Sequence, residues 1–327
     1  MRNITVEVSS NYDVIIENNL LDHVEDYLDL KRKYFIVTDN LVPYEYIEKL
    51  LKKINASVYV IDGNGEEIKT LETISGILDC LVNIQTPKDI CIVAVGGGVV
   101  GDISAFVSSI YKRGVSFINI PTTLLSMVDS SIGGKNGVNM NGYKNIVGTI
   151  YQPNLVLIDP TVLKTLKERH FNNGMAEVIK MAAISDKKFF EELININVFD
   201  SLEEIIYKSL MIKKKFVEAD EFDNGIRMAL NFGHTIGHAI EMIDDNIYHG
   251  EAVAYGMNKI IKDDKMKEIL RKFNLYNETN YDKETILNII KNDKKIKGNK
   301  LNFVVVNEIG SYEIKQITLE ELEREYL

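Results

Sequence analysis

The chain has 327 residues, 45% of them hydrophobic and 26% charged, which is the balance of a globular protein. Because this length exceeds the usual size of one hydrophobic core, we expect two domains. The net charge of −10 argues against a general nucleic-acid binder but does not exclude a local basic pocket for a small anion. The sequence contains no apolar run of membrane-spanning length and no signal-peptide pattern, so we expect a cytoplasmic enzyme or binding protein with no membrane partner.

Short β-rich runs alternate with helical patterns from the N-terminus to about residue 155. The expected strands are Ile4–Val8, Tyr34–Thr38, Val58–Ile61, Ile90–Val95, Ser116–Ile120 and Leu155–Asp159. Strands separated by helices pair in parallel through right-handed crossovers, so residues 1–155 are predicted to form a doubly wound, Rossmann-like α/β domain. Cys80 falls in a helical pattern and Cys91 in a buried strand, and both are expected to be reduced packing residues.

A glycine-rich turn, GGGVVGD, follows the apolar strand Ile90–Val95. Gly96, Gly98 and Gly101 fit the G-x-G-x-x-G pattern, in which glycines let backbone N–H groups approach a pyrophosphate at a helix N-terminus. Asp102 lies at the expected helix start. The turn follows the fourth or fifth strand instead of the first, and no acidic residue stands about twenty positions later. A nucleotide site is favoured, and a purely structural turn remains the alternative.

The next segment, residues 121–148, is rich in glycine, serine, threonine and asparagine. It carries Asp129, Lys135 and Lys144, and we expect a flexible loop that contacts a cofactor and an anionic substrate. Its GGK sequence is not a P-loop, because Asn136 stands where that motif requires serine or threonine.

Beyond residue 155 long helical periods dominate, and a lone β-like run, LNFVVV, appears near the end. Residues 156–327 are therefore predicted to form a mostly α-helical second domain. Its helix NNGMAEVIK places Glu177 and Lys180 three residues apart on one face. Such a pair is usually a surface ion pair, but the apolar neighbours indicate a buried helix, where it would suit a metal ligand beside a cation.

Three of the five histidines lie within sixteen residues of this second half. His234 and His238 are four apart and share one helical face, and His249 follows after a polar turn, next to Glu251. Two imidazoles and a carboxylate would bind a divalent ion and leave a coordination position open for substrate. The alternative is a set of surface or capping histidines.

Taken in order, these motifs resemble the 3-dehydroquinate synthase family of the sugar-phosphate cyclase superfamily. The matching segments are GGGVVGD, YKRG, PTTLLSMVDSSIGGKNGVN, YKNIVGTIYQP, GMAEVIK, LNFGHTIGHAIE and HGEAVAYGM. The resemblance implies a lyase of the shikimate pathway of aromatic amino acid biosynthesis. Such an enzyme converts 3-deoxy-D-arabino-heptulosonate 7-phosphate to 3-dehydroquinate and phosphate with catalytic NAD and Zn²⁺ (or Co²⁺). Another sugar-phosphate cyclase, or a metal- and NAD-dependent polyol dehydrogenase, is the alternative.

The resemblance also implies the site residues and a homodimer. The metal ligands would be Glu177, His234 and His249. The residues expected to act in catalysis are Asp129, Lys135, Lys180, Lys213, Arg227, Asn231 and His238. Those expected to bind substrate are Arg113, Asn145 and Lys294, with Lys295 as the alternative to Lys294. NAD would contact Asp39, Glu66, Lys69, Gly96, Gly97, Gly98, Asp102, Thr122, Thr123, Lys135, Lys144 and Thr165. In the family the arginine at the Arg113 position reaches the neighbouring subunit's site. The chain is short at its C-terminal end, and His170 departs from the family pattern.

Overall fold

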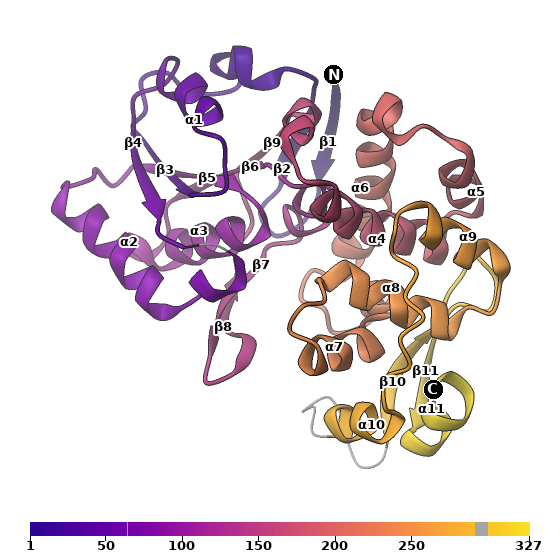
Figure 1. Ribbon diagram of the computed structural model, residues 1–327. Coiled ribbons are helices and arrows are strands. Elements are labelled where there is room, and N and C mark those ends of the chain that lie inside the picture. The colour runs from indigo at the N-terminus through magenta and orange to yellow at the C-terminus, as the bar shows by residue number, and fades with distance from the viewer. Residues whose placement is uncertain (64, 292–299) are drawn as a thin grey trace. The chain divides into compact units, whose positions relative to one another are not determined.

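The protein consists of two compact units, Met1–Lys167 and Glu168–Leu327 (Figure 1). The computed structural model describes residues 1–63, 65–291 and 300–327. The boundary between the units lies twelve residues beyond the expected residue 155, because the strand at Leu155–Ile158 is an integral part of the first unit's sheet. None of the helices within these described ranges combines enough length with enough apolar character to cross a lipid bilayer.

A seven-stranded sheet forms the centre of the first unit. Its strands, in spatial order, are β1 (Arg2–Val6), β2 (Tyr12–Ile16), β9 (Leu155–Ile158), β6 (Ser116–Pro121), β5 (Cys91–Gly96), β3 (Tyr34–Asp39) and β4 (Ala56–Ile61). Every neighbouring pair is parallel except the antiparallel pair β1–β2. The predicted doubly wound fold is confirmed. The order reverses between β3 and β5, since the chain first passes outward from β3 to β4 and then returns to the other side of β3.

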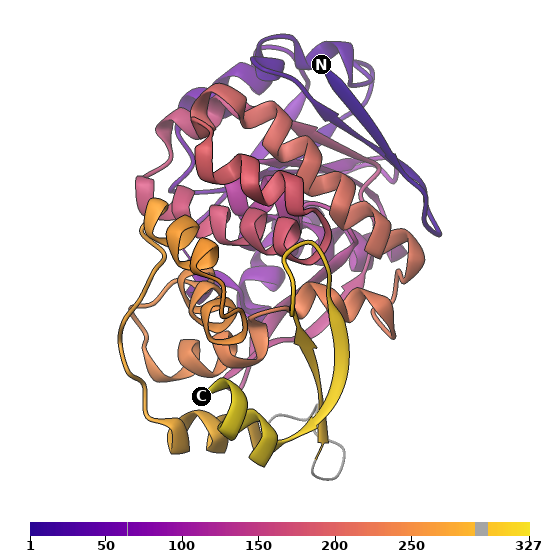
Figure 2. The ribbon, with the colours of Figure 1, turned by 90° about the vertical axis from the view of Figure 1, so that its right-hand side faces the viewer.

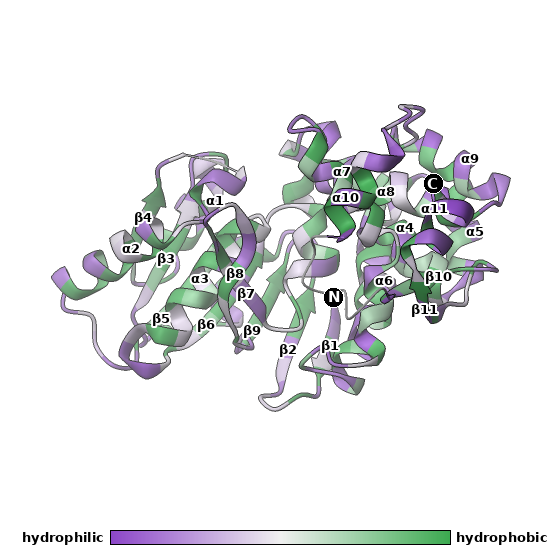
Figure 3. Cartoon of the chain, turned by 90° about the horizontal axis from the view of Figure 1, so that it is seen from below, coloured by the Kyte–Doolittle hydropathy of each residue, from purple (hydrophilic) through white to green (hydrophobic). Residues whose placement is uncertain are grey.

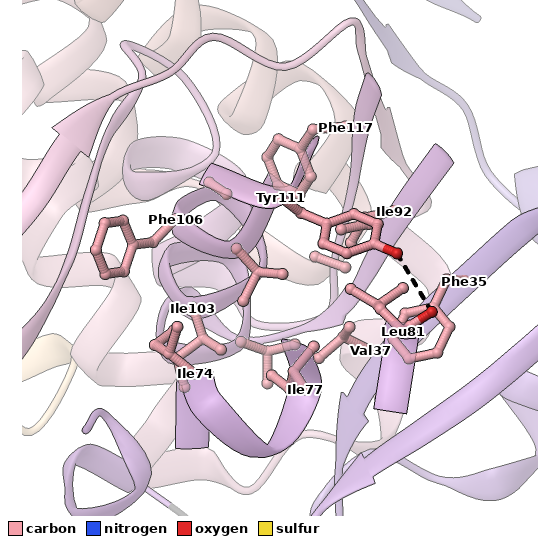
Figure 4. Close-up of a cluster of buried hydrophobic side chains, with 14 of the residues drawn as sticks. Phe35, Val37, Ile74, Ile77, Leu81, Ile92, Ile103, Phe106, Tyr111 and Phe117 are labelled. Atoms are coloured by element: carbon pink, nitrogen blue, oxygen red, sulfur yellow. Dashed lines mark hydrogen bonds between the residues drawn. The ribbon is translucent and has the colours of Figure 1, made fainter. Parts of the chain in front are cut away.

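Helices cover both faces of this sheet. Helix α1 (Tyr44–Leu51) packs beside the short helix η1 (Leu20–Asp26), and α2 (Leu71–Asn83) and α3 (Gly98–Ile110) share the opposite face (Figure 1). Figure 4 shows the core beneath α2 and α3, where Ile77, Ile103 and Phe35 are buried and the Tyr111 hydroxyl donates to the Leu81 carbonyl. The colouring of Figure 3 shows how apolar α3 is. The close packing of these buried side chains holds α3, including its first turn, against the sheet.

The segment expected to be a flexible loop is instead ordered, and that expectation was wrong. After the short helix η4 (Ser126–Ser130), the strands β7 (Lys135–Met140) and β8 (Tyr143–Ile150) form an antiparallel hairpin. Asn141 and Gly142 make its two-residue turn, both with positive φ (52° and 80°). Such a turn matches the twist of the flanking strands, and Asn-Gly is its strongest sequence signal.

The second unit is mostly helical, as predicted. Its helices are α4 (Glu168–Ser185), α5 (Lys187–Asn195), α6 (Leu202–Ala219), α7 (His234–Ile243), α8 (His249–Ile260), α9 (Asp264–Lys272), α10 (Lys283–Lys291) and α11 (Leu319–Tyr326), with short helices η6 (Val198–Ser201) and η7 (Ile226–Asn231). Helix α4 is buried from Phe171 to Ile184 and contacts α5, α6, α8 and η7. The lone β-like run is β10 (Lys300–Val305), which pairs with a strand that the sequence pattern did not reveal, β11 (Glu313–Thr318); Figure 2 shows this hairpin in yellow.

Candidate metal centre and nucleotide site

The glycine turn of the first unit lies at the carboxyl end of β5, beside the point where the strand order reverses. Gly97 is the N-cap of α3, so the first free N–H groups of that helix follow it directly. Asp39 ends β3 on the other side of the reversal point. Open α/β sheets bind ligands in the crevice at such a point. The geometry therefore supports a nucleotide site and not merely a structural turn.

Acidic and basic side chains flank the start of α3. Lys69 is buried and donates from Nζ to Asp102 Oδ2 at 2.5 Å, and Glu66 Oε1 lies 3.9 Å from the same Nζ. Asp39 accepts backbone N–H groups of Leu41 and Val42, and its burial raises the pKa of its carboxyl. An anchored carboxylate at the end of a strand is a suitable acceptor for ribose hydroxyls.

The remaining residues proposed for the cofactor lie on neighbouring elements. Just beyond β6, the Thr122 N–H donates to the Gly96 carbonyl at the end of β5, and Thr123 follows Thr122. Asp102 and Lys135 both line a small cavity beside α3, together with Asn119, Ser130 and Ser131. Lys144 is exposed on β8, and Thr165 hydrogen-bonds Tyr46 Oη at 2.9 Å. Most of the residues proposed for the cofactor therefore lie near the carboxyl ends of the strands, whereas Lys144 lies on the β7–β8 hairpin.

Three residues proposed for the substrate lie elsewhere in the first unit. Asp129 is half-buried in η4, and Asn145 is exposed on β8, where its N–H donates to Asn139 Oδ1. Arg113 is exposed and follows the C-terminal end of α3. Since α3 has thirteen residues, it separates Arg113 from the glycine turn by about 20 Å at 1.5 Å per residue. Arg113 therefore lies far from the nucleotide site of its own chain.

Glu177, His234 and His249 converge in the second unit from three helices, α4, α7 and α8. His249 Nε2 lies 3.5 Å and His234 Nε2 3.8 Å from Glu177 Oε1, and the three ligand atoms all lie within 4.8 Å of one another. Tetrahedral zinc with ligands near 2.0–2.1 Å requires separations of about 3.3 Å. The prediction that these three side chains meet agrees with this geometry.

Close backbone contacts make this convergence possible. A Cβ atom on Gly250 would lie 2.2 Å from the Asn173 carbonyl oxygen of α4, and one on Gly256 would lie 2.0 Å from the Gly233 carbonyl oxygen. Only glycine permits such an approach. The Gly250 N–H also donates to Asn173 Oδ1, which ties the first turn of α8 to α4. These contacts hold His249 against Glu177.

The charges of this cluster are shaped by burial and by one lysine. Burial alone would raise the pKa of Glu177, but the positive charge of Lys180, which contacts Oε2, together with His249 lowers it to about 2. Burial lowers the pKa of His234 well below its usual range, so its imidazole is neutral. Burial also opposes a charge on His249, but Glu177 and Glu241 outweigh it and raise its pKa to about 9.

The donor set fits a divalent ion. Both oxygens of the fully buried Glu177 carboxylate lack a hydrogen bond of regular geometry, although Lys180 Nζ contacts one of them. His234 Nδ1 lies 3.1 Å from the Phe232 carbonyl, so a proton on Nδ1 leaves Nε2 for a metal. One carboxylate and two imidazoles form the protein side of a catalytic zinc site. Glu251, which follows His249 closely in sequence, instead binds Arg169 at 2.7 and 2.8 Å.

Three buried cations lie on α4 and on two elements that pack against it. Lys180 on α4, Lys213 on α6 and Arg227 on η7 are each at most 5% exposed, and these three elements pack against one another. Arg227 is held in place by its N–H, which donates to Asp220 Oδ2, and by Nη1, which donates to the Glu221 carbonyl. Asn231 ends η7 and is partly buried. Such a group of cations is suited to an anionic substrate.

His238 lies outside the ligand triad. It is on α7, its ring is 5.2 Å from that of His234, and its side chain is 46% exposed. Lys294 lies outside the described residues. Glu241 was not recognised from the sequence, yet its Oε2 lies 3.3 Å from His249 Nδ1. Its position seven residues after His234, on the same helical face, was the available signal.

Comparisons with known proteins agree with this arrangement. Residues 59–173 match the family model described as 3-dehydroquinate synthase N-terminal, and residues 174–296 match 3-dehydroquinate synthase C-terminal. The chain is 39% identical to the 3-dehydroquinate synthase of Lactococcus lactis subsp. cremoris (strain MG1363) and 42% identical to that of Streptococcus pneumoniae serotype 19F (strain G54). Each alignment covers 97% of this chain and 96% of the relative.

Solved structures of two related synthases have the same fold. A 2-deoxy-scyllo-inosose synthase complexed with carbaglucose-6-phosphate, NAD⁺ and Co²⁺ superposes with a TM-score of 0.88 at 25% identity, covering 100% of both chains. The 2-epi-5-epi-valiolone synthase of Streptomyces hygroscopicus subsp. jinggangensis 5008, with NAD⁺ and Zn²⁺ bound, gives 0.86 at 27% identity, covering 97% of this chain and 96% of that one. Because the identity to curated relatives is about 40% over nearly the whole length, the chain belongs to the 3-dehydroquinate synthase family.

Proposed function

We propose that this chain is a 3-dehydroquinate synthase of the shikimate pathway, which converts 3-deoxy-D-arabino-heptulosonate 7-phosphate to 3-dehydroquinate and phosphate. The observation that carries this proposal is the buried triad of Glu177, His234 and His249, in a chain about 40% identical to curated 3-dehydroquinate synthases. The reaction involves no net oxidation, so the nicotinamide cofactor is regenerated in each turnover.

NAD binds the first unit and a divalent ion, zinc or cobalt, binds the second. Glu177, His234 and His249 hold the ion. The cofactor contacts are those at the glycine turn and the strand ends, namely Asp39, Glu66, Lys69, Gly96, Gly97, Gly98, Asp102, Thr122, Thr123, Lys135, Lys144 and Thr165. When bound, the two groups supply transient oxidation at C5 of the substrate and polarisation of its hydroxyls.

The chain's own side chains bind and orient a multiply charged substrate. Lys180, Lys213 and Arg227 supply positive charge from three packed elements, and Arg227 can bind a carboxylate through two parallel hydrogen bonds. Asn231 hydrogen-bonds substrate hydroxyls. Asp129 and His238 are our candidates for holding or moving protons, because both are titratable and accessible to solvent.

The active form is a homodimer in which Arg113 reaches the partner's site. The support is its position: Arg113 is exposed and lies about 20 Å along α3 from the glycine turn of its own chain. An exposed arginine at that end suits recognition of a phosphate across an interface. We also infer a cytoplasmic location, as expected for a biosynthetic enzyme of this class.

One assay tests the proposal. The purified protein is incubated with the heptulosonate phosphate, zinc and trace NAD⁺, and released phosphate and dehydroquinate are measured together with absorbance at the nicotinamide band. We expect many turnovers per NAD⁺ and no accumulation of NADH. Stoichiometric NADH would indicate a polyol dehydrogenase instead, and failure to produce dehydroquinate would point to a cyclase with a different substrate.

A further inference from the structure

Glu241 contacts the side of His249 that faces away from the ligand triad. Its Oε2 lies 3.3 Å from His249 Nδ1, while Nε2 of the same ring lies 3.5 Å from Glu177 Oε1. The Glu241 side chain is 11% exposed, so it does not sample solvent freely. Its position on α7, two helical turns after His234, places it on the face that carries the histidine ligand. The imidazole of His249 therefore lies between two carboxylates.

This arrangement suits a His249 that offers Nε2 to an ion. An imidazole that gives Nε2 to a metal carries its proton on Nδ1, and that proton needs an acceptor. A carboxylate is the strongest acceptor that a protein offers, and it also increases the basicity of the ring. The partner of His234 is weaker, since its Nδ1 lies against the neutral carbonyl of Phe232.

We propose that Glu241 is a positioning residue that orients His249 for metal binding by accepting the hydrogen bond from Nδ1. This inference rests on the proposed function, because it assumes that the triad holds the ion. Glu241 does not contact the ion itself; it acts through His249. The family resemblance implied no role for Glu241.

His238, Glu241 and His249 also form a second group whose ligand atoms lie within 4.8 Å of one another. His249 Nδ1 belongs to this group and Nε2 to the triad. A neutral imidazole has only one nitrogen without a proton, so His249 cannot ligate an ion in each group without becoming an imidazolate. The geometry therefore favours a hydrogen bond from His249 to Glu241 over a second ion.

The test compares two substitutions with a matched control. Glu241→Gln keeps a neutral acceptor of the same size, and Glu241→Leu removes the acceptor. Glu268→Gln on the exposed face of α9 changes the same charge elsewhere. The zinc affinity of each full-length protein is measured by competition with a chromogenic chelator. We expect roughly 10- to 100-fold weaker binding for Glu241→Leu, an intermediate loss for Glu241→Gln and no change for Glu268→Gln.

A spectroscopic readout separates positioning from a general loss of stability. In the cobalt-substituted protein, the ligand-field bands should shift in Glu241→Gln, because the basicity of one ligand changes, while the melting temperature of the metal-free protein stays unchanged. Unchanged zinc affinity and unchanged bands in both Glu241 variants would overturn the inference. So would two cobalt ions per wild-type chain falling to one in Glu241→Gln. If the wild-type chain retained no zinc, the proposed function itself would fail.

Discussion

At the scale of single residues, the proposed metal site consists of side chains whose other contacts determine which of their atoms could face an ion. His234 has its Nδ1 against a backbone carbonyl, and Glu177 has no exposed surface through which water could replace a ligand. Lys180 contacts the Glu177 carboxylate directly and keeps it ionised. An ionised carboxylate and a neutral imidazole are the protonation states that zinc requires.

Removing one imidazole should abolish metal retention. We expect His249→Ala to lose its zinc on dialysis and to lose turnover, because two protein ligands hold the ion far less tightly than three. The measurement is metal content per chain by atomic emission. His23→Ala, which removes a histidine of the first unit that pairs with Glu17, should keep the full zinc content. A His249→Ala protein with a full complement of zinc would exclude this ligand.

A second substitution separates substrate binding from cofactor binding. Arg227→Lys keeps the charge but loses the planar pair of donors, so we expect KM for the heptulosonate phosphate to rise about 10- to 100-fold, as for the loss of a charge-assisted hydrogen bond. The Kd for NAD⁺, measured by fluorescence titration, should stay the same, because Arg227 belongs to the second unit and the glycine turn to the first. An equal loss of both affinities would contradict this division of roles.

The sequence indicated that histidines cluster in the second unit, because spacing within a helix is regular. His234 and His238 could be assigned to one face of α7 from their separation alone. Glu241 could not be connected to His249 in the same way. The two residues are separated by the turn between α7 and α8, and the direction of the chain through that turn depends on tertiary packing. The contact of Arg169 with Glu251 could not be predicted for the same reason, because it depends on the packing of α4 against α8.

At the scale of helices and strands, the site depends on how closely three helices approach. The carbonyl of Gly233, just before α7, occupies the space that a side chain at position 256 on α8 would need. Gly233 itself has φ of +79°, a conformation that other residues adopt only under strain. Glycines therefore set the separation between the helix that carries His234 and the helix that carries His249.

A single methyl group should disturb this packing. A Cβ on Gly256 would lie 2.0 Å from the Gly233 carbonyl oxygen, so we expect Gly256→Ala to lower the melting temperature, at a cost of about 1–3 kcal/mol, and to weaken zinc binding by separating α7 from α8. Calorimetry and chelator competition measure the two effects. Wild-type stability together with wild-type zinc affinity would show that the helices have room to adjust.

Strand prediction succeeded where the apolar pattern was continuous and failed where the pairing was local. The buried strand β5 was evident, because parallel strands covered on both faces are apolar throughout. The hairpin β7–β8 was mistaken for a loop because its glycines and asparagines outweighed its alternation, although Asn141-Gly142 marks a hairpin turn. The strands β2 and β11 were missed as well, since both are short and each pairs with a neighbouring strand in a local antiparallel hairpin.

At the scale of the whole molecule, the chain divides its chemistry between two units. The first contains the glycine turn at the reversal point of its sheet, and the second contains the proposed metal ligands and the buried cations Lys180, Lys213 and Arg227. Each unit has its own hydrophobic core, so each ligand should stabilise the unit that binds it.

Hydrogen exchange followed by mass spectrometry can test this division. A ligand present at 100 times its Kd stabilises the state that binds it by about 2.7 kcal/mol, which slows exchange through local opening about 100-fold. We expect zinc to protect peptides from α4, α7 and α8, and NAD⁺ to protect peptides covering the end of β3 and the start of α3. The His249→Ala protein, treated with zinc, should show no protection. If zinc instead protected peptides of residues 1–167 and left α8 unchanged, the ion would bind the other unit, and the triad would not be its site.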